Sequence, residues 1–213
     1  MLILGLTGSI AMGKSRAAAM FRAFGVPVFD ADATVHALFA PGGAAVAPVE
    51  QAFPGTRTPE GAIDRVRLGQ RVMGDAPALA RLEKIVHPLV RAAEGRFLRR
   101  CSRAGVSVAV LDIPLLFETD GEHRVDRVAV VSANREVQTM RALRRPGMTR
   151  TRLDQIRGKQ LPDAEKRRRA DYVLASGSDR GYLAGQIGQV LADLSRVRPA
   201  AWPTAWLRHG VHA

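Results

Sequence analysis

Residues 8–15 read "GSIAMGKS" and come directly after the apolar run "LILGLT" at residues 2–7. They match the pattern GxxxxGK[ST] in full, at Gly8, Gly13, Lys14 and Ser15. In this pattern glycines let backbone N–H groups surround a phosphate, and the lysine reaches the outer phosphates of a nucleotide. A chance match in a chain of this length is expected at a rate on the order of one per cent. The helix formers that follow place a helix N-terminus at the anion, so the stretch predicts a phosphate-binding loop rather than an ordinary strand-to-helix turn.

Two residues are unusual for such a loop. Ala11 stands where glycine is frequent, and we expect it to fit with a negative φ. Arg16 follows the hydroxyl residue; its backbone N–H can donate to a phosphate, while its side chain either turns outward or approaches an α-phosphate. We expect the ATP phosphates to be held by Gly8, Ala11, Met12, Gly13, Lys14, Ser15 and Arg16.

Short apolar, β-branched runs alternate with helical patterns along the chain, which is typical of a parallel sheet with crossover helices. The expected strands cover residues 2–7, 26–29, 106–112, 126–131 and 172–175. We therefore predict an α/β P-loop NTPase fold in three layers, with a five-stranded parallel sheet. Its predicted parts are a core of residues 1–30, 105–138 and 170–195, a helical insertion of 31–104, a basic helical insertion of 139–169, and a loosely ordered tail of 196–213.

Composition excludes several classes of protein. With 213 residues, 46% of them hydrophobic, the chain can bury one sizeable core. Cys101 is the single cysteine, which excludes an internal disulfide framework and a cysteine-built metal site. The apolar run at residues 2–7 lacks a basic leader and a cleavage site, and no stretch approaches the roughly 18 apolar residues that span a membrane. We expect a cytoplasmic protein without a membrane partner.

The charge is strongly positive, at +12 with a sequence pI near 11.3. Between residues 139 and 169 there are nine Arg and two Lys against three acidic residues. A polyanionic small molecule and nucleic acid both fit such a surplus. Arginines on a mobile insertion also suit a lid that neutralises charge during phosphoryl transfer, although most of these cations are expected on a solvated helix face.

"VFDAD" puts Asp30 and Asp32 at the carboxyl end of the second expected strand, the edge where ligands of open parallel sheets bind. A carboxylate there can accept the proton of an attacking hydroxyl while a γ-phosphoryl group leaves ATP. If a helix starts at Ala31, one of the two aspartates is instead a helix cap.

Six stretches of the sequence resemble the motifs of a known enzyme family. In chain order they are "GLTGSIAMGKS", "GVPVFDADATVH", "VHPLV", "VLDIPLLFE", "VQTMRALRR" and "KQLPDAEKRRRADYVL". Together they resemble the successive motifs of dephospho-coenzyme A kinases, from about Leu2 to about Leu194. The resemblance implies a P-loop kinase with a helical CoA-binding insertion at 31–104 and a lid at 139–169. It implies transfer of the γ-phosphate of ATP to the ribose 3′-hydroxyl of dephospho-CoA, with Mg2+, in the last step of CoA synthesis.

The resemblance also implies roles for single residues. Asp32 matches the second aspartate of the family's DAD and is the implied catalytic base. Lys14 is implied to clamp the γ-phosphate, and Ser15 to bind Mg2+. Arg141 and Arg145 fall on the lid arginines, of which Arg141 is the stronger catalytic candidate.

For Gln138 the resemblance implies only a position: it falls on the residue that precedes the lid arginines. Other positions keep two interpretations. His87 falls on the His-Pro of the substrate insertion, but Pro88 also favours a helix start there. Glu118 either orients substrate or pairs with a nearby arginine, and Asp112 is either a second magnesium-organising carboxylate or a strand-end turn residue.

The chain departs from the family's pattern at three positions. The family commonly has Gly at position 11 and Thr at position 16, and Asp where this chain has Pro146. The rival hypotheses are another small-molecule or nucleotide kinase and a nucleic-acid-linked P-loop ATPase. Against the second, the chain has no NKxD-like guanine motif and its cations concentrate where a lid is expected. We therefore expect ATP and dephospho-CoA as partners and no nucleic acid, while the oligomeric state stays open.

Overall fold

The computed structural model describes residues 1–208 of the chain. The chain forms two compact units. Unit 1 consists of Met1–Phe29 and Leu98–Ala213, and unit 2 consists of Asp30–Phe97.

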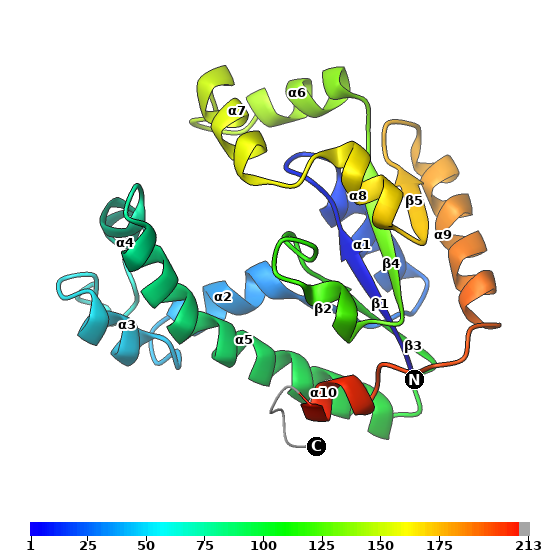
Figure 1. The fold of residues 1–213 in the computed structure, drawn as a ribbon, viewed down its shortest axis with the longest axis horizontal. Coiled ribbons are helices and arrows are strands. Elements are labelled where there is room, and N and C mark those ends of the chain that lie inside the picture. Colours follow the sequence, from blue (N-terminus) through cyan, green and yellow to red (C-terminus); the bar gives the residue numbers. More distant parts are fainter. Residues whose placement is uncertain (209–213) are drawn as a thin grey trace. The chain divides into compact units, whose positions relative to one another are not determined.

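A single sheet has the strand order β2-β3-β1-β4-β5 (Figure 1). The strands are β1 (Leu2–Thr7), β2 (Val28–Asp30), β3 (Val108–Asp112), β4 (Arg127–Ser132) and β5 (Tyr172–Ala175). β1 runs parallel to β3 and to β4, and β4 runs parallel to β5. The predicted five-stranded parallel sheet is therefore confirmed, with the second strand shifted toward Asp30. The central position of β1 places the loop that follows it in the middle of the sheet's carboxyl edge.

Both faces of β1 are buried, as its unbroken apolar sequence requires. On one face, Leu2, Leu4 and Leu6 form a core with α1 (Lys14–Ala23) and α9 (Arg180–Leu194). On the other face, a Cβ added at Gly5 would lie 2.8 Å from Leu116, which belongs to the segment after β3. The expected closing helix is confirmed as α9, which begins at Arg180 because Asp179 caps it by accepting a hydrogen bond from the Tyr182 N–H.

Three helices lie between β4 and β5 in sequence: α6 (Arg135–Leu143), α7 (Arg150–Lys159) and α8 (Asp163–Arg169). Figure 1 shows α6 and α7 beyond the carboxyl end of β4, whereas α8 packs against that strand. We call α6 and α7 with their connecting turn the α6–α7 hairpin. These helices occupy the basic stretch for which the sequence predicts a lid.

The tail is ordered as far as the structure describes it, so the expectation of a loose tail is wrong for residues 196–208. The short helix α10 (Thr204–Arg208) follows a turn in which Ala200 and Ala201 donate their N–H groups to Asp126 Oδ1. Asp126 Oδ2 in turn accepts from the Ile3 N–H. Trp206 is only 2% exposed, and its indole N–H donates to the Arg124 carbonyl. The burial of one large aromatic side chain thus fixes a segment whose proline content suggests disorder. Arg124, whose carbonyl accepts the hydrogen bond from Trp206, is the last residue of the 3-10 helix η1 (Gly121–Arg124).

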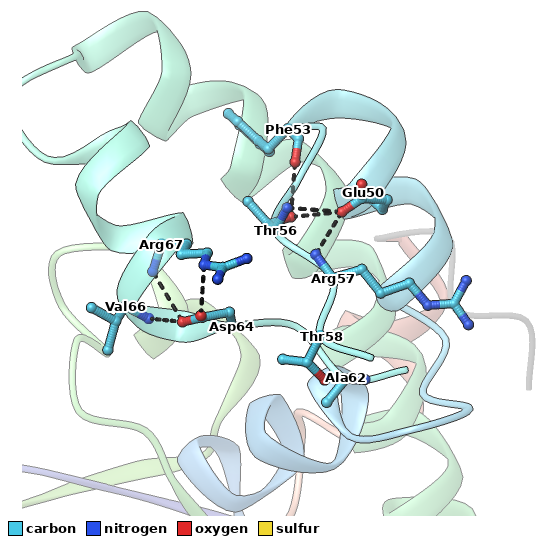
Figure 2. Close-up of polar contacts among 9 residues, drawn as sticks. All are labelled: Glu50, Phe53, Thr56, Arg57, Thr58, Ala62, Asp64, Val66 and Arg67. Atoms are coloured by element: carbon cyan, nitrogen blue, oxygen red, sulfur yellow. Dashed lines mark hydrogen bonds and ion pairs between the residues drawn. The ribbon is translucent and has the colours of Figure 1, made fainter. Parts of the chain in front are cut away.

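Unit 2 contains α2 (Ala31–Phe39), α3 (Val46–Ala52), α4 (Arg65–Val72) and the part of α5 (Ala76–Arg103) up to Phe97. Its core is built from the apolar faces of these helices. Figure 2 shows how Glu50 organises the turn between α3 and α4: its carboxylate accepts the backbone N–H groups of Gly55, Thr56 and Arg57, and the last two of these are drawn. In the same figure Asp64 caps α4 by accepting from the N–H groups of Val66 and Arg67.

The helix start expected at Pro88 is wrong, because α5 continues through this residue. Leu82, Ile85, Leu89 and Val90 pack on one apolar cluster on both sides of the proline, and this packing outweighs the backbone hydrogen bond that proline cannot make. Among the described helices, none combines the length and apolar character needed to cross a bilayer.

Candidate phosphate-binding and active site

The loop between β1 and α1 is shaped by two close approaches. Gly13 has φ +91°, and a Cβ at this position would lie 2.8 Å from Ser176 Oγ, so the position requires glycine for its conformation and for its space. A Cβ at Gly8 would lie 2.6 Å from the Val131 carbonyl oxygen on β4. The loop is therefore pressed against the ends of β4 and β5.

Ala11 has φ +60°, so the expected negative φ is wrong. An L-residue adopts this left-handed conformation at a cost, which glycine largely avoids. Ala11 is 7% exposed and packs with Ala142 of α6 and Leu153 of α7. Contacts from residues far away in sequence thus compensate for a backbone conformation that the side chain disfavours.

The loop leaves several backbone donors for a ligand. Met12 donates its N–H to the Ser9 carbonyl, and Arg16 and Ala17 donate to the Gly13 carbonyl at the start of α1. Among the described residues, no acceptor meets the N–H groups of Ala11, Gly13, Lys14 or Ser15. Such donors, next to the N-terminus of a ten-residue helix, are the kind of groups that bind anions in proteins.

Lys14 points its ammonium group to Asp112, with 2.6 Å between Nζ and Oδ1. Asp112 ends β3, is 3% exposed, and lies opposite Leu6 in the neighbouring strand β1. Lys14 and Asp112, both of them predicted site residues, therefore meet at the loop. An acidic group one strand away holds the lysine at the position where phosphates would bind.

Arg141 of α6 reaches the same loop through Ser176, which follows β5. Its guanidinium donates to the hydroxyl and to the carbonyl of Ser176, at 2.9 and 2.7 Å. The Ser176 hydroxyl donates in turn to the Met12 carbonyl. Burial lowers the pKa of Arg141, and the positive charge of Arg16 lowers it further. Since arginine stays protonated in proteins, the site concentrates positive charge next to the loop.

Arg16 lies close enough to Arg141 for its positive charge to lower the pKa of Arg141. Both arginines line one cavity of about 620 Å³, together with Arg180 and the segment Gly177–Asp179. Arg16 lies in the first turn of α1. Among the described residues, no carboxylate forms an ion pair with it.

The comparison with protein-family models identifies the family of this chain. Residues 2–180 match the family model described as dephospho-CoA kinase. The chain belongs to the dephospho-CoA kinase family.

Individual relatives support this assignment. The dephospho-CoA kinase of Paramagnetospirillum magneticum is 61% identical over 201 residues, which cover 94% of each chain. A solved structure from Thermus thermophilus is 34% identical with a TM-score of 0.78, over 91% of this chain and 97% of the other. The dephospho-CoA kinase structure from Campylobacter jejuni has a TM-score of 0.59 over 90% of this chain and 96% of the other; at 22% identity it supports the fold alone.

Asp30 and Asp32 have different places in this dephospho-CoA kinase family member. The helix α2 begins at Ala31, and Asp30 caps it by accepting from the Ala33 N–H at 2.9 Å. Asp32 lies exposed in the first turn of α2. Of the two interpretations of this pair, the one in which a single aspartate caps the helix is confirmed, and Asp30 is that cap. His87 is exposed on α5.

The remaining predicted positions are not brought to the loop. Glu118 forms an ion pair with the fully buried Lys166, at 2.8 Å, and accepts from the Leu161 N–H. Its partner is thus a lysine of α8 and not an arginine. Arg145 lies exposed in the turn after α6. Within the described residues, neither a hydrogen bond nor an ion pair ties the Arg145 side chain to the loop.

Sequence reasoning missed Ser176, Arg157 and Gln160, and assigned no function to Gln138. Ser176 follows the expected strand at 172–175, so the rule that ligands bind at carboxyl strand ends could have found it. The other three lie on a long basic insertion, where the sequence pattern does not distinguish inward from outward side chains.

Proposed function

We propose that this protein catalyses the reaction of its family, phosphorylation of the ribose 3′-hydroxyl of dephospho-CoA by ATP, with the loop of residues 8–15 as its triphosphate site. The observation that carries this is the set of unbonded N–H groups beside Lys14 and Arg141, in a chain whose residues 2–180 match the dephospho-CoA kinase model. The reaction gives CoA and ADP, and in CoA synthesis it is the last step.

In the proposed mechanism the 3′-oxygen attacks the γ-phosphorus while the bond to the β–γ bridging oxygen breaks. Asp32 accepts the proton of the hydroxyl as general base. Lys14 leaves Asp112 and follows the γ-phosphoryl group, and Arg141 neutralises charge that develops on the transferring oxygens. Backbone N–H groups fix the β-phosphate, so the nucleotide is positioned without dependence on side chains at positions 9–12.

We propose that the cavity lined by Arg16, Arg141 and Arg180 takes the remaining part of ATP. It lies at the N-terminus of α1, where a nucleotide held by its phosphates extends away from the loop. The Arg16 side chain then supplies the positive charge near the α-phosphate that a hydroxyl would otherwise supply as a donor.

Mg2+ is the proposed cofactor. Among the described residues there is no cluster of three or more His, Cys, Asp or Glu side chains with metal-ligand geometry. This fits Mg2+, which commonly uses one or two protein oxygens together with substrate phosphates and water. Ser15 and Asp112 are the oxygen donors at the loop. When bound, the ion would neutralise phosphate charge.

Dephospho-CoA is proposed to bind through unit 2, where His87 is the proposed contact, and Glu118 of unit 1 is a second proposed contact. The protein is proposed to work in the cytoplasm without nucleic acid. Several cations of the basic stretch bind protein groups: Arg141 holds Ser176, Arg157 holds Gln138, and Lys166 holds Glu118. These contacts within the protein support the proposal that the surplus positive charge does not serve to bind nucleic acid.

The decisive experiment is an ADP-release assay with Mg2+ and ATP over dephospho-CoA, adenosine, AMP and shikimate, each with and without nucleic acid. We expect turnover with dephospho-CoA alone. ATP hydrolysis that nucleic acid stimulates, without phosphorylation of dephospho-CoA, would refute the proposed function.

A further inference from the structure

Both backbone polar groups of one loop residue, Ile10, are bound by glutamine side chains. The Ile10 N–H donates to Gln160 Oε1 at 3.0 Å, and the Ile10 carbonyl accepts from Gln138 Nε2 at 2.9 Å. Gln138 belongs to α6, whereas Gln160 is the residue that ends α7. The two ends of the α6–α7 hairpin therefore hold a single residue of the phosphate loop from two sides.

The orientation of these amides follows from their partners. Arg157 donates Nε and Nη2 to Gln138 Oε1, at 3.0 and 2.7 Å. A guanidinium has donors only, so the Gln138 oxygen must face Arg157 and its NH2 group must face the Ile10 carbonyl. The Ile10 N–H can meet only an acceptor, so Gln160 presents its oxygen. Gln138 is 5% exposed, which shields these bonds from water.

The next residue explains why the loop needs such support. Ala11 has φ +60°, which is unfavourable for alanine, and it packs with Ala142 and Leu153 of the hairpin. If Ile10 were free to rotate, Ala11 could relax, and its N–H would turn away from the position of the phosphate. Polar bonds at Ile10 and apolar contacts at Ala11 thus act on one short segment.

We propose that Gln138 and Gln160 are positioning residues that hold Ile10 and Ala11 in the phosphate-binding conformation, with Arg157 fixing the orientation of Gln138. The proposal rests on the proposed function insofar as the ligand is ATP. Neither glutamine touches the reacting atoms; both act through the loop. By linkage, ATP binding stabilises the α6–α7 hairpin as much as the hairpin favours ATP binding.

The test uses glutamates of equal size in the full-length protein. Gln138→Glu keeps acceptors for Arg157 but replaces the donor at the Ile10 carbonyl with a second acceptor. Gln160→Glu keeps the acceptor that Ile10 needs. Gln155→Glu adds the same charge at an exposed position of α7 and serves as the control. ATP affinity is measured by calorimetry without dephospho-CoA, and kcat and the ATP KM are measured with it.

We expect Gln138→Glu to raise the Kd and KM for ATP about tenfold, the effect of one lost hydrogen bond of average to high strength. Its kcat at saturating ATP stays within about threefold of wild type, because bound phosphates restore the loop conformation. Gln160→Glu raises the Kd less than Gln138→Glu does, and Gln155→Glu leaves it unchanged.

Equal losses in Gln138→Glu and Gln160→Glu would overturn the proposal, because added charge alone would then explain them. An unchanged Kd in Gln138→Glu, or a loss confined to kcat, would also overturn it. If Gln138→Glu does not fold, Gln160→Met, which removes the acceptor, must raise the Kd for ATP. Calorimetry needs no turnover. The proposal about the two glutamines can therefore fail while dephospho-CoA phosphorylation is intact, and it can hold when no such phosphorylation is found.

Discussion

Lys14 Nζ lies 2.6 Å from Asp112 Oδ1, so the cation that is expected to bind phosphate is already paired with a carboxylate. Asp112 is almost fully buried, and the pair joins the end of β3 to the first residue of α1. A nucleotide must therefore compete with Asp112 for Lys14. In return, the lysine is held close to the loop before the nucleotide arrives, which lowers the entropic cost of placing it.

Lys14→Ala removes this cation. We expect kcat/KM for ATP to fall about 10- to 150-fold, since a hydrogen bond to a charged group contributes about 1.5 to 3 kcal/mol. Steady-state kinetics with dephospho-CoA at saturation measures the effect. Lys84→Ala, which removes an exposed lysine of α5, is the control. Equal kinetics in the two variants would contradict the assignment of the loop as the ATP site.

Asp32→Asn removes the proposed base while keeping the size of the side chain. We expect kcat to fall by about two to four orders of magnitude, with the ATP KM nearly unchanged. Asp30→Ala is the matched comparison: it removes the helix cap and costs about 1 kcal/mol of stability, measured by denaturant unfolding, and it leaves kcat largely intact. If Asp30→Ala lost more activity than Asp32→Asn, the two roles would have to be exchanged.

Arg16→Thr restores the residue that is common in the family. We expect the ATP KM to rise a fewfold at low ionic strength and the difference to shrink at about 0.5 M salt, because salt screens the Arg16 charge. Arg150→Thr, at the exposed start of α7, removes an equal charge outside the cavity. Equal KM values in the two variants at low salt would place the Arg16 side chain outside the ATP site.

Trp206→Ala tests the ordered tail. The indole ring is buried, lies under the Arg124 guanidinium and donates to the Arg124 carbonyl, so we expect a loss of about 3 to 5 kcal/mol in the free energy of unfolding. Phe24→Ala truncates an aromatic side chain that is 49% exposed and should cost about 0.5 kcal/mol or less. Denaturant titration that finds equal losses would show that the tail does not dock in solution.

Glu50 provides a pH-dependent contribution to unit 2. The hydrogen bond from the Gly55 N–H, followed by those from Arg57 and Thr56, lowers the pKa of Glu50. A carboxylate with a lowered folded-state pKa stabilises the fold above its unfolded pKa and loses this effect as the pH falls through the folded value. We expect Glu50→Gln to lower the Tm at pH 7.

The gap in Tm between wild type and Glu50→Gln should narrow as the pH falls below the ordinary value of 4.5. Glu83→Gln, at an exposed position of α5, should not change Tm at either pH. Thermal unfolding at pH 7 and at about pH 3.5 compares the three proteins. A Glu50→Gln gap that stays constant over this range would rule out the carboxylate as the cause.

The sequence predicted those features that depend on local residue type. β1 and its loop follow from an unbroken apolar run and the spacing of Gly8, Gly13, Lys14 and Ser15. The five strands follow from short β-branched runs, and the family follows from motifs that all lie within the matched residues 2–180.

Features that depend on distant contacts were missed or wrong. The sign of φ at Ala11 depends on Ala142 and Leu153, which approach the loop only in the folded chain. The course of α5 through Pro88 depends on the cluster that its two halves share. The roles of Gln138, Gln160 and Ser176 require knowing which backbone group faces each side chain, and the residue pattern of a helix or strand end does not contain that information.

The contacts of Asp126 bear on how the protein is synthesised. Its carboxylate joins the Ile3 N–H to those of Ala200 and Ala201, so this part of unit 1 cannot be completed until the ribosome has made the chain as far as Ala201. Unit 2 is one continuous stretch, Asp30–Phe97, and all of it can leave the exit tunnel much earlier. During translation, all residues of unit 2 are therefore available before β3 and β4, the partners of β1 in the sheet, have been made.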